Sequence, residues 1–284
     1  MKCSILLCCL LLTATTRADD AVRIEKDVSY LPAERKEKAD LYLPAEDGQK
    51  HPGVVIIHGG GWTGGIKDAK REINIGTTLA AHGYVCMSID YQLHDSKSPT
   101  PCWPQNLHDC KTAVRWLRAN AERLHLDSAH IGVIGGSAGG HLASMVGITG
   151  PEAGLDPAGP YGEQSCRVNC VVDMYGPADI EHYKDISALR KTRAESPELY
   201  KQFSLLTYLD QSDPPFLILH GTADKTVDVE QSKILDAALA KHGIEHHLEI
   251  IEGAPHTFHL QPSQKDLRPL VLAFFDKHLK PAAK

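Results

Sequence analysis

The chain has 284 residues, of which 42% are hydrophobic and 23% are charged. This composition excludes a disordered or fibrous protein, and the length allows one domain to bury roughly 75% of its unfolded surface. The formal net charge of −6, without a basic run, argues against nucleic acid and anionic membrane surfaces as partners.

The first 18 residues have the layout of a cleavable secretory signal peptide. Lys2 provides a positive start, residues 5–12 form an apolar stretch, and residues 16–18 end in a small residue. The apolar stretch is shorter than the roughly 20 residues that a membrane-spanning helix needs, and an uncleaved N-terminal anchor is the alternative interpretation. No later segment is long and apolar enough to cross a membrane. We therefore expect an exported protein, periplasmic or secreted, with its domain at residues 19–284.

From residue 50 onward, short apolar runs alternate with longer amphipathic ones, which predicts βαβ units around a parallel sheet. Stretches near Val28 and Leu41 precede this alternation, and we expect them to form antiparallel edge strands. Further strands are predicted at residues 54–58, 85–90, 131–135, 170–175, 216–220 and 247–251. Helices are predicted at residues 70–81, 105–121, 138–147, 229–241 and 267–279.

Two segments fall outside the alternation. Residues 92–104 form a proline-bearing loop before a predicted helix, and residues 179–213 are polar and partly helical between two predicted strands. Long insertions in a compact domain are commonly lids or binding loops. We therefore expect residues 179–213 to form a small lid or cap, and both segments to influence substrate specificity.

Five cysteines follow the predicted signal peptide, and an odd number leaves at least one of them unpaired or paired between chains. Cys102 with Cys110, or Cys166 with Cys170, could form disulfides in an oxidising compartment, whereas Cys86 is expected to be a small buried hydrophobe. No two close cysteine pairs have finger-like spacing, which argues against zinc. We expect no metal and no cofactor.

The sequence Gly-Gly-Ser-Ala-Gly at residues 135–139 fits the Gly-x-Ser-x-Gly pattern and lies where a predicted strand passes into a helix. A serine on such a sharp turn has a strained backbone and an exposed hydroxyl, with the helix N-terminus behind it. The alternative is a glycine-rich turn whose serine only caps the helix. The strand–turn–helix context favours Ser137 as a catalytic nucleophile.

The sequence His-Gly-Gly-Gly-Trp at residues 58–62 directly follows a predicted strand. Glycines bring backbone N–H groups close to a ligand, as an oxyanion hole requires. We expect Gly60, Gly61 and Ala138 to donate to the oxyanion. A flexible turn and a phosphate loop are the alternatives, and the latter is disfavoured because no Gly-Lys-Ser/Thr follows.

A serine nucleophile needs a base and a group that orients the base, in the chain order Ser, Asp, His for this kind of turn. Asp224 and His256 each lie just past a predicted strand, in the expected order. His256 would take the Ser137 proton, and Asp224 would hold the imidazole tautomer. Asp228 and His259 are rival candidates, and both lie later in their loops.

Aromatic residues in the loops near these motifs are candidate walls of a substrate pocket, although a loop aromatic is more often ordinary packing. They are Trp62, Tyr91, Trp103 and Tyr183.

Together these stretches resemble the hormone-sensitive-lipase-like and feruloyl or acetyl-xylan-esterase-like branch of α/β-hydrolases. The resemblance runs from about residue 40 to the C-terminus and is carried by HGGGW (58–62), IDY (89–91), CKTAVRWLRANA (110–121), GGSAGGHLA (135–143), DPPFLILHGTAD (213–224) and the His-Thr-Phe at 256–258. It implies the α/β-hydrolase fold, with a mostly parallel eight-stranded sheet flanked by helices. It also implies that Ser137, Asp224 and His256 are the triad, and that Gly60, Gly61 and Ala138 are the oxyanion donors.

Three positions depart from the pattern of these relatives. Gly136 stands where Asp is frequent, Gln92 stands where Arg often follows the Asp-Tyr pair, and Asp228 stands where Pro is usual. None of the departures removes a reacting group.

The leading hypothesis is a carboxylesterase acting on a small-molecule or carbohydrate ester. Amide cleavage is the main alternative, because kynurenine formamidases have a comparable His-Gly-Gly-x-Trp loop, but export argues against a role in amino-acid catabolism. A catalytically dead binding module would lack a reacting group, and none is missing. The sequence predicts no oligomeric state.

Overall fold

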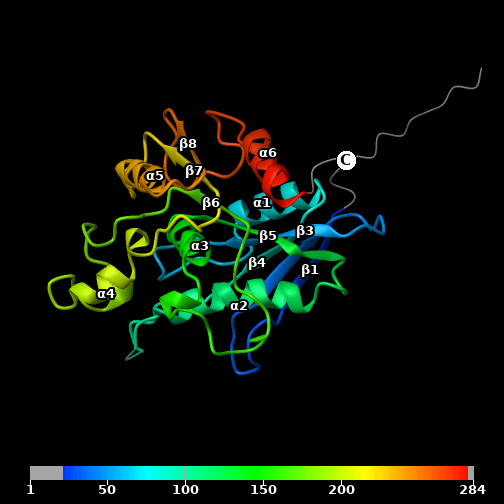
Figure 1. The fold of residues 1–284 in the computed structure, drawn as a ribbon, viewed down its shortest axis with the longest axis horizontal. Helices are drawn as coiled ribbons and strands as arrows, with labels where there is room; N and C mark the ends of the chain where they lie inside the picture. The colour runs from blue at the N-terminus through cyan, green and yellow to red at the C-terminus, as the bar shows by residue number, and fades with distance from the viewer. Residues whose placement is uncertain (1–21, 99, 281–284) are drawn as a thin grey trace, which may run out of the picture.

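An eight-stranded sheet with the order β1-β2-β4-β3-β5-β6-β7-β8 organises the chain (Figure 1). The structure is a computed structural model that describes residues 22–98 and 100–280. β1 and β2 pair antiparallel, as do β2 and β4, and all the other neighbouring strands pair parallel. The prediction of a mostly parallel sheet with antiparallel edge strands is therefore confirmed, whereas the predicted signal peptide at residues 1–18 lies outside the described residues.

The strands agree with the predicted apolar runs to within a few residues, except that β5 begins earlier. The observed strands are β1 (Arg23–Val28), β2 (Ala39–Leu43), β3 (His51–Ile57), β4 (Val85–Ile89), β5 (Leu126–Gly136), β6 (Cys170–Met174), β7 (Phe216–Gly221) and β8 (His246–Ile251). The central strands β3, β4, β6 and β7 are almost fully buried and carry one charged residue, Asp173. Such continuous apolar strands are typical of a parallel sheet that helices cover on both faces.

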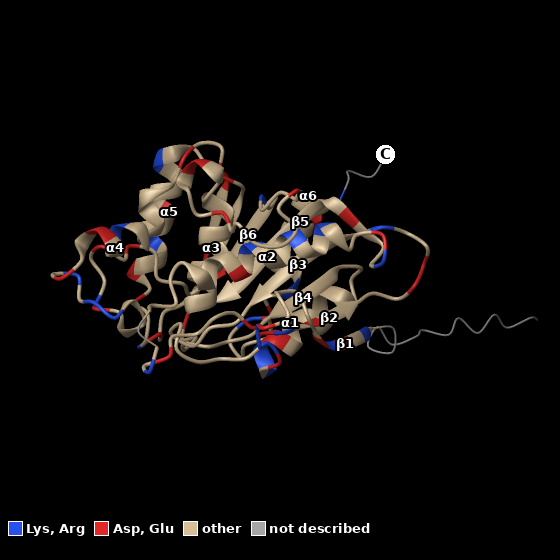
Figure 2. Cartoon of the chain, turned by 90° about the horizontal axis from the view of Figure 1, so that it is seen from below, with Lys and Arg blue, Asp and Glu red and all other residues tan. Residues whose placement is uncertain are grey.

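Helices cover both faces of the sheet. They are α1 (Lys70–Ala80), α2 (Gln105–Ala119), α3 (Ala138–Ile148), α4 (Pro197–Gln202), α5 (Glu230–His242) and α6 (Arg268–Leu279). α1 and α6 pack on one face, in a core with alternate β3 residues such as Val54, whereas α2, α3 and α5 pack on the other face with residues such as Val55. Figure 2 shows the Lys, Arg, Asp and Glu residues interspersed along helices and loops around strands that are mostly uncharged.

The segment at residues 179–213, called the insert below, holds only short helical elements: η3 (Ser187–Leu189), α4 and η4 (Leu205–Thr207). Its Leu205 N–H donates to the Ala178 carbonyl at 3.1 Å, and its Arg190 guanidinium donates to the carbonyl of Ser98. The insert is therefore tied both to the loop after β6 and to the loop before α2, and the latter is the other segment that we expected to influence specificity.

The five cysteines of the described residues are all free thiols. The two disulfides considered from the sequence do not form. Cys102 Sγ lies 3.8 Å from the Ala188 carbonyl oxygen, and Cys110 is fully buried in the core on α2. Cys170 lies in β6, in the same core as Phe275 of α6, and burial raises the pKa of its thiol. Among the described residues, no helix has the length and apolar character needed to cross a membrane.

Candidate active site

Ser137 lies on the turn between β5 and α3 with φ 58° and ψ −124°. A positive φ is strained for a residue with a Cβ, and such strain persists only where the surroundings hold it. Here the Ser137 N–H donates to the Met174 carbonyl of β6 at 2.8 Å, and the Ser137 carbonyl accepts the His141 N–H at 3.0 Å. The turn is thus fixed from the strand and the helix together.

The small neighbours of Ser137 allow the turn to close. A Cβ at Gly135 would lie 2.2 Å from the Gly139 carbonyl oxygen, and a Cβ at Gly139 would lie 2.2 Å from the Ile57 carbonyl oxygen. These contacts are with backbone, so no side-chain movement could relieve them. At Gly136 a Cβ would lie 2.6 Å from Nη1 of Arg71, which fills the space beside this position.

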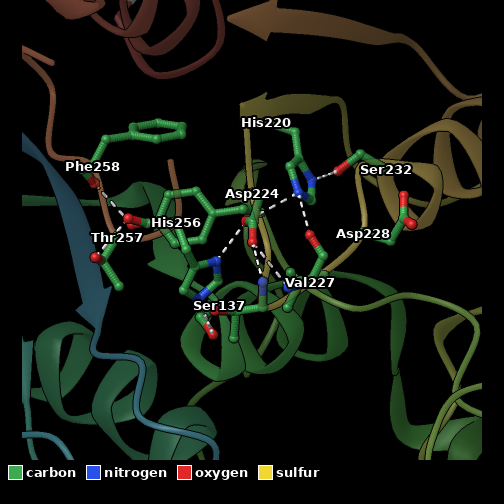
Figure 3. Close-up of polar contacts among 12 residues, drawn as sticks. Ser137, His220, Asp224, Val227, Asp228, Ser232, His256, Thr257 and Phe258 are labelled. Carbon is green, nitrogen blue, oxygen red and sulfur yellow. Dashed lines mark hydrogen bonds and ion pairs between the residues drawn. The ribbon is translucent and has the colours of Figure 1, made fainter. Parts of the chain in front are cut away.

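Ser137, His256 and Asp224 form a line of hydrogen-bonded side chains (Figure 3). His256 Nε2 lies 3.0 Å from Ser137 Oγ, and His256 Nδ1 lies 2.5 Å from Asp224 Oδ2. The three residues follow β5, β7 and β8, whose carboxyl ends meet at one edge of the sheet. An imidazole between a hydroxyl and a carboxylate can accept the hydroxyl proton while the carboxylate stabilises the resulting cation.

The rival residues Asp228 and His259 lie elsewhere. Asp228 Oδ1 accepts the Glu230 N–H at the start of α5, and it points away from His256 in Figure 3. His259 Nδ1 accepts the Gln261 N–H at 2.9 Å within its own loop. Both residues therefore have local structural partners instead of contacts with Ser137.

Asp224 is held as a buried carboxylate, with its side chain 1% exposed. Its Oδ1 accepts the N–H groups of Thr226 at 2.8 Å and Val227 at 3.0 Å, so Oδ2 remains for His256. Burial acts to raise the pKa of Asp224, but the hydrogen bonds from His256 and from these two amides outweigh it and hold the pKa below its ordinary value. The carboxylate is therefore charged wherever His256 needs a counter-ion.

His220, at the end of β7, contacts Asp224 from the side opposite His256 (Figure 3). Its Nε2 lies 3.0 Å from the Val227 carbonyl oxygen and 3.3 Å from Asp224 Oδ2, and its Nδ1 lies 2.7 Å from Ser232 Oγ. Burial lowers the pKa of His220, which keeps the ring neutral. Nε2–H then donates to Val227 and Asp224 while Nδ1 accepts from Ser232. The sequence offered one signal for this residue: His220 opens the HGTAD stretch that ends at Asp224.

Tyr175 packs against the ring of His256 and helps to position it. Its ring meets the imidazole edge-on with centroids 4.8 Å apart, and its hydroxyl donates to the Phe258 carbonyl at 2.8 Å. The same hydroxyl accepts from Arg71 Nη1 at 2.9 Å. This chain of contacts links α1 to the loop that carries His256. The sequence analysis missed Tyr175 and Arg71, because neither belongs to a recognisable motif.

The glycine-rich loop after β3 faces the same edge of the sheet. Gly60 and Gly61 have φ values of 118° and 62°, which only glycine adopts without strain. The Gly60 carbonyl accepts from Thr63 at 3.1 Å and from Gly64 at 3.0 Å, which curls the loop. Within the described residues, the N–H groups of Gly60 and Gly61 donate to no protein acceptor, and Ala138 is the first residue of α3, where N–H groups have no intrahelical partner. These donors are free for a ligand.

Two cavities meet at Ser137. One has a volume of about 240 Å³ and is lined by Trp62, Ala138, Val227 and residues 183–187 of the insert, among others. The other, of about 460 Å³, is lined by Gly59, Gly60, Arg71, Glu72 and His256, among others. Gly61, Ser137 and Thr226 line both cavities. We call them the insert cavity and the Arg71 cavity.

The expected pocket aromatics divide into two groups. Trp62 and Tyr183 line the insert cavity beside Ser137. Tyr91 and Trp103 line neither cavity, and this corrects the expectation for them. The Tyr91 ring stacks on His58 at 4.3 Å, behind the glycine-rich loop, and its hydroxyl donates to the His58 carbonyl. Trp103 packs edge-on against Phe203 of the insert and is 4% exposed.

No cluster of three or more His, Cys, Asp or Glu side chains able to hold a metal ion occurs among residues 22–98 and 100–280. The groups that meet at Ser137 in this part of the chain are an imidazole, a carboxylate and backbone amides. Such an arrangement is suited to acyl transfer, because it can move a proton and stabilise a developing oxyanion at one place.

Comparisons with known proteins agree with this geometry. Residues 39–239 match the model of the BD-FAE family. Among curated proteins, the esterase LipC of Mycobacterium tuberculosis is 32% identical over 193 residues, which cover 64% of this chain and 46% of LipC. The chain spans about half the length of the mycobacterial relatives LipC, LipQ and LipM, from 43% to 53%.

Solved structures extend the comparison to nearly the whole chain. A truncated form of a carbohydrate esterase from gut microbiota has a TM-score of 0.84 and 26% identity, covering 93% of this chain and 98% of its own. An acetyl ester-xyloside bifunctional hydrolase from Caldicellulosiruptor lactoaceticus has a TM-score of 0.72 and 26% identity, covering 86% and 89%. The predicted α/β-hydrolase fold and the resemblance to this branch of it are confirmed.

Proposed function

The chain belongs to the BD-FAE family of α/β-hydrolases, and from this premise we propose that it is a carboxylic ester hydrolase with Ser137 as nucleophile. The observation that carries the proposal is the alignment of Ser137 Oγ, the His256 ring and Asp224 through contacts of 3.0 Å and 2.5 Å. The names of its relatives, an esterase and a carbohydrate esterase, support the same reaction.

In the first half of the reaction, Ser137 Oγ attacks the carbonyl carbon of the ester and its proton passes to His256 Nε2. The tetrahedral intermediate then collapses, the bond from the acyl carbon to the alcohol oxygen breaks, and His256 returns its proton to that oxygen. The alcohol leaves, and the acyl group remains on Ser137 as an ester. Asp224 stabilises the imidazolium that exists between the two proton transfers.

The second half uses water. His256 takes a proton from a water molecule as the water oxygen attacks the acyl carbon. Ser137 Oγ then departs from the second tetrahedral intermediate and regains a proton from His256, and the carboxylic acid is released. Each group returns to its starting protonation state, so the cycle needs no other reactant.

Both tetrahedral intermediates place negative charge on the former carbonyl oxygen. We assign the N–H groups of Gly60, Gly61 and Ala138, which donate to no acceptor within the described residues, as the donors to this oxygen. Because these amides are already oriented, they need no rearrangement as the charge develops. Loss of one such donor costs an ester hydrolase on the order of 3 kcal/mol of transition-state stabilisation.

The substrates that we propose are esters of short acyl groups, including esters linked to carbohydrate. Two structural neighbours, a carbohydrate esterase and an acetyl ester-xyloside bifunctional hydrolase, support this class. We further propose that residues 1–18 direct export, that residues 19–284 form the catalytic domain, and that the insert at residues 179–213 caps the site.

Hydrolysis of 4-nitrophenyl acetate and butyrate tests the proposal. We expect Ser137→Ala to lower kcat by about 10⁶-fold, because the nucleophile is lost while the fold remains. Ser263→Ala, at an exposed serine, is the matched control and should leave kcat unchanged. Equal activity of Ser137→Ala and the wild type would refute the assignment. A panel with an aryl formamide and a short peptide amide distinguishes the amide alternative.

A further inference from the structure

We infer that the two cavities at Ser137 divide the substrate between them: the acyl group lies in the insert cavity and the leaving alcohol lies in the Arg71 cavity. We further infer that Ile186 of the insert sets the length of acyl chain that is accepted. This inference rests on the proposed ester hydrolysis and assigns a direction to the substrate within the site.

The position of His256 determines which part of the ester lies in which cavity. In acylation the alcohol oxygen must receive its proton from His256 Nε2, so the leaving group has to lie on the imidazole side of Ser137. His256 lines the Arg71 cavity and does not line the insert cavity. The acyl group, on the other side of the attacked carbon, then points into the insert cavity, whose wall includes Ala138.

The insert cavity is small and largely apolar. Its volume of about 240 Å³ is below the roughly 300 Å³ at which pockets for drug-sized ligands begin. Trp62, Pro177, Ile186 and Val227 supply apolar wall atoms. The ring of Trp62 makes an edge-on contact with the ring of Phe203, with centroids 5.0 Å apart. Because this packing is close, the cavity does not widen easily on the Trp62 side. The cavity therefore suits an acetyl group or another short chain.

Ile186 closes this cavity from the insert and is itself firmly held. It is 6% exposed, and its N–H donates to the Tyr200 hydroxyl at 2.9 Å. Tyr200 in turn donates to the Lys191 carbonyl at 2.9 Å, and the Ile186 carbonyl accepts the Leu189 N–H at 3.0 Å. A rigid branched side chain at this position limits the chain length that fits beneath it.

The Arg71 cavity is the larger of the two. Its volume of about 460 Å³ is almost twice that of the insert cavity, and glycines form much of its wall. Arg71 and Glu72 pair within it through two hydrogen bonds, one of them 2.8 Å from Nε to Oε1. This ion pair is neutral overall and the rest of the exposed wall is mostly apolar, so the cavity suits an uncharged alcohol and does not select for a charged one.

Two substitutions outside the catalytic residues test the assignment separately. Ile186→Ala enlarges the insert cavity, and Ala69→Phe, at the start of α1, narrows the Arg71 cavity that Ala69 lines. One substrate series varies the acyl chain of 4-nitrophenyl esters from acetate to octanoate. The other keeps the acetyl group and varies the alcohol from methanol through phenol to xylobiose.

We expect each substitution to affect one series only. Ile186→Ala should raise the kcat/KM ratio of hexanoate to acetate by about tenfold, since one methylene in an apolar pocket changes discrimination by roughly that factor or more. Ala69→Phe should lower the ratio of xylobiose acetate to methyl acetate by about tenfold. Leu189→Ala, which removes a buried neighbour that does not line the insert cavity, and Lys70→Phe, at an exposed position of α1 that does not line the Arg71 cavity, are the controls.

If Ile186→Ala proves unstable, Ile186→Val removes one methylene and should shift the acyl ratio in the same direction by a smaller factor. The inference is overturned if Ile186→Ala leaves the acyl ratio unchanged, or if Ala69→Phe changes the acyl ratio instead of the alcohol ratio. Failure of the proposed function itself looks different, because the wild type would then hydrolyse neither series.

Discussion

Asp224 lies within hydrogen-bonding distance of two histidines that differ in role. His256 bridges it to Ser137, whereas neutral His220 donates toward Oδ2 from the buried side and is itself fixed by Ser232. The two backbone amides on Oδ1 complete the set of donors. A carboxylate with this many donors has a fixed orientation and a lowered pKa, as an acid that only orients the base requires.

Asp224→Asn tests this role at the residue scale. The amide preserves the shape of the side chain but removes its charge and favours the wrong imidazole tautomer. We expect kcat to fall by about 10⁴-fold with little change in KM. Steady-state kinetics with 4-nitrophenyl acetate measures both values.

The matched control is Asp228→Asn, in the same loop. Asp228 accepts the Glu230 N–H at 2.9 Å and has no contact with His256. We expect it to retain wild-type kcat. A loss at position 228 as large as the loss at position 224 would show that the acid of the triad has been misassigned.

At the scale of elements, the turn after β5 depends on the neighbouring strand β6. Asp173 in β6 is fully buried, and its carboxylate accepts from Gly176 N–H at 2.8 Å and from Ser144 Oγ of α3 at 3.0 Å. Burial raises the pKa of Asp173 to about 6, because these two hydrogen bonds only partly offset the cost of a buried charge. The carboxylate thus ties α3, the helix behind Ser137, to the sheet.

The raised pKa makes a prediction about stability. In the folded chain Asp173 has a pKa of about 6, against an ordinary value of 3.8. Below pH 3.8 the carboxyl group is protonated in both the folded and the unfolded chain, and its contribution to the unfolding free energy is fully present. This contribution is lost as the pH rises through about 6. The difference of about two pKa units corresponds to about 3 kcal/mol.

Asp173→Asn should remove this dependence, since the amide can accept from Gly176 and hydrogen-bond Ser144 without ionising. We subtract the unfolding free energy of the wild type from that of the variant at each pH. We expect this difference to be about 3 kcal/mol larger at pH 8 than at pH 4. Urea denaturation of both proteins at the two pH values measures the change. A constant difference between variant and wild type at both pH values would contradict the raised pKa.

Most of the elements were predictable from the sequence, because the central strands are apolar runs and the longer helices have an apolar periodicity of their own. Residues 54–57 and 216–219 are continuous apolar runs, and such runs are buried in β3 and β7. β5 is the exception: its first part, beginning at Leu126, is polar and half-exposed. No local pattern distinguishes such a polar extension from a loop, so the early start of this strand was missed.

For the whole molecule, side-chain direction was the limit of sequence reasoning. Ser137, Asp224 and His256 could be proposed because each follows a strand in a fixed order. Tyr91 and Trp103 were expected in the pocket because they are loop aromatics, but which side of a loop a ring faces depends on distant packing partners. For the same reason no sequence pattern marked Tyr175, which directly follows β6, or Arg71 of α1, although their side chains are in contact.

The elements on each face of the sheet position a different part of the site. α3 and the insert belong to one core and shape the insert cavity, whereas α1 belongs to the other core and carries Arg71 and the adjoining cavity. The line from Ser137 to Asp224 runs along the edge of the sheet, where both cores end. The insert cavity can therefore change with the insert while the hydrogen-bonded line stays fixed by the sheet.

Covalent labelling with a fluorophosphonate, followed by mass spectrometry of proteolytic peptides, tests the central claim most directly. We expect one adduct per chain, located on Ser137 in the peptide that contains residues 135–139, with activity lost in proportion to labelling. Ser137→Ala should remain unlabelled. Adduct formation at a different residue, or full activity in protein labelled at Ser137, would contradict the account.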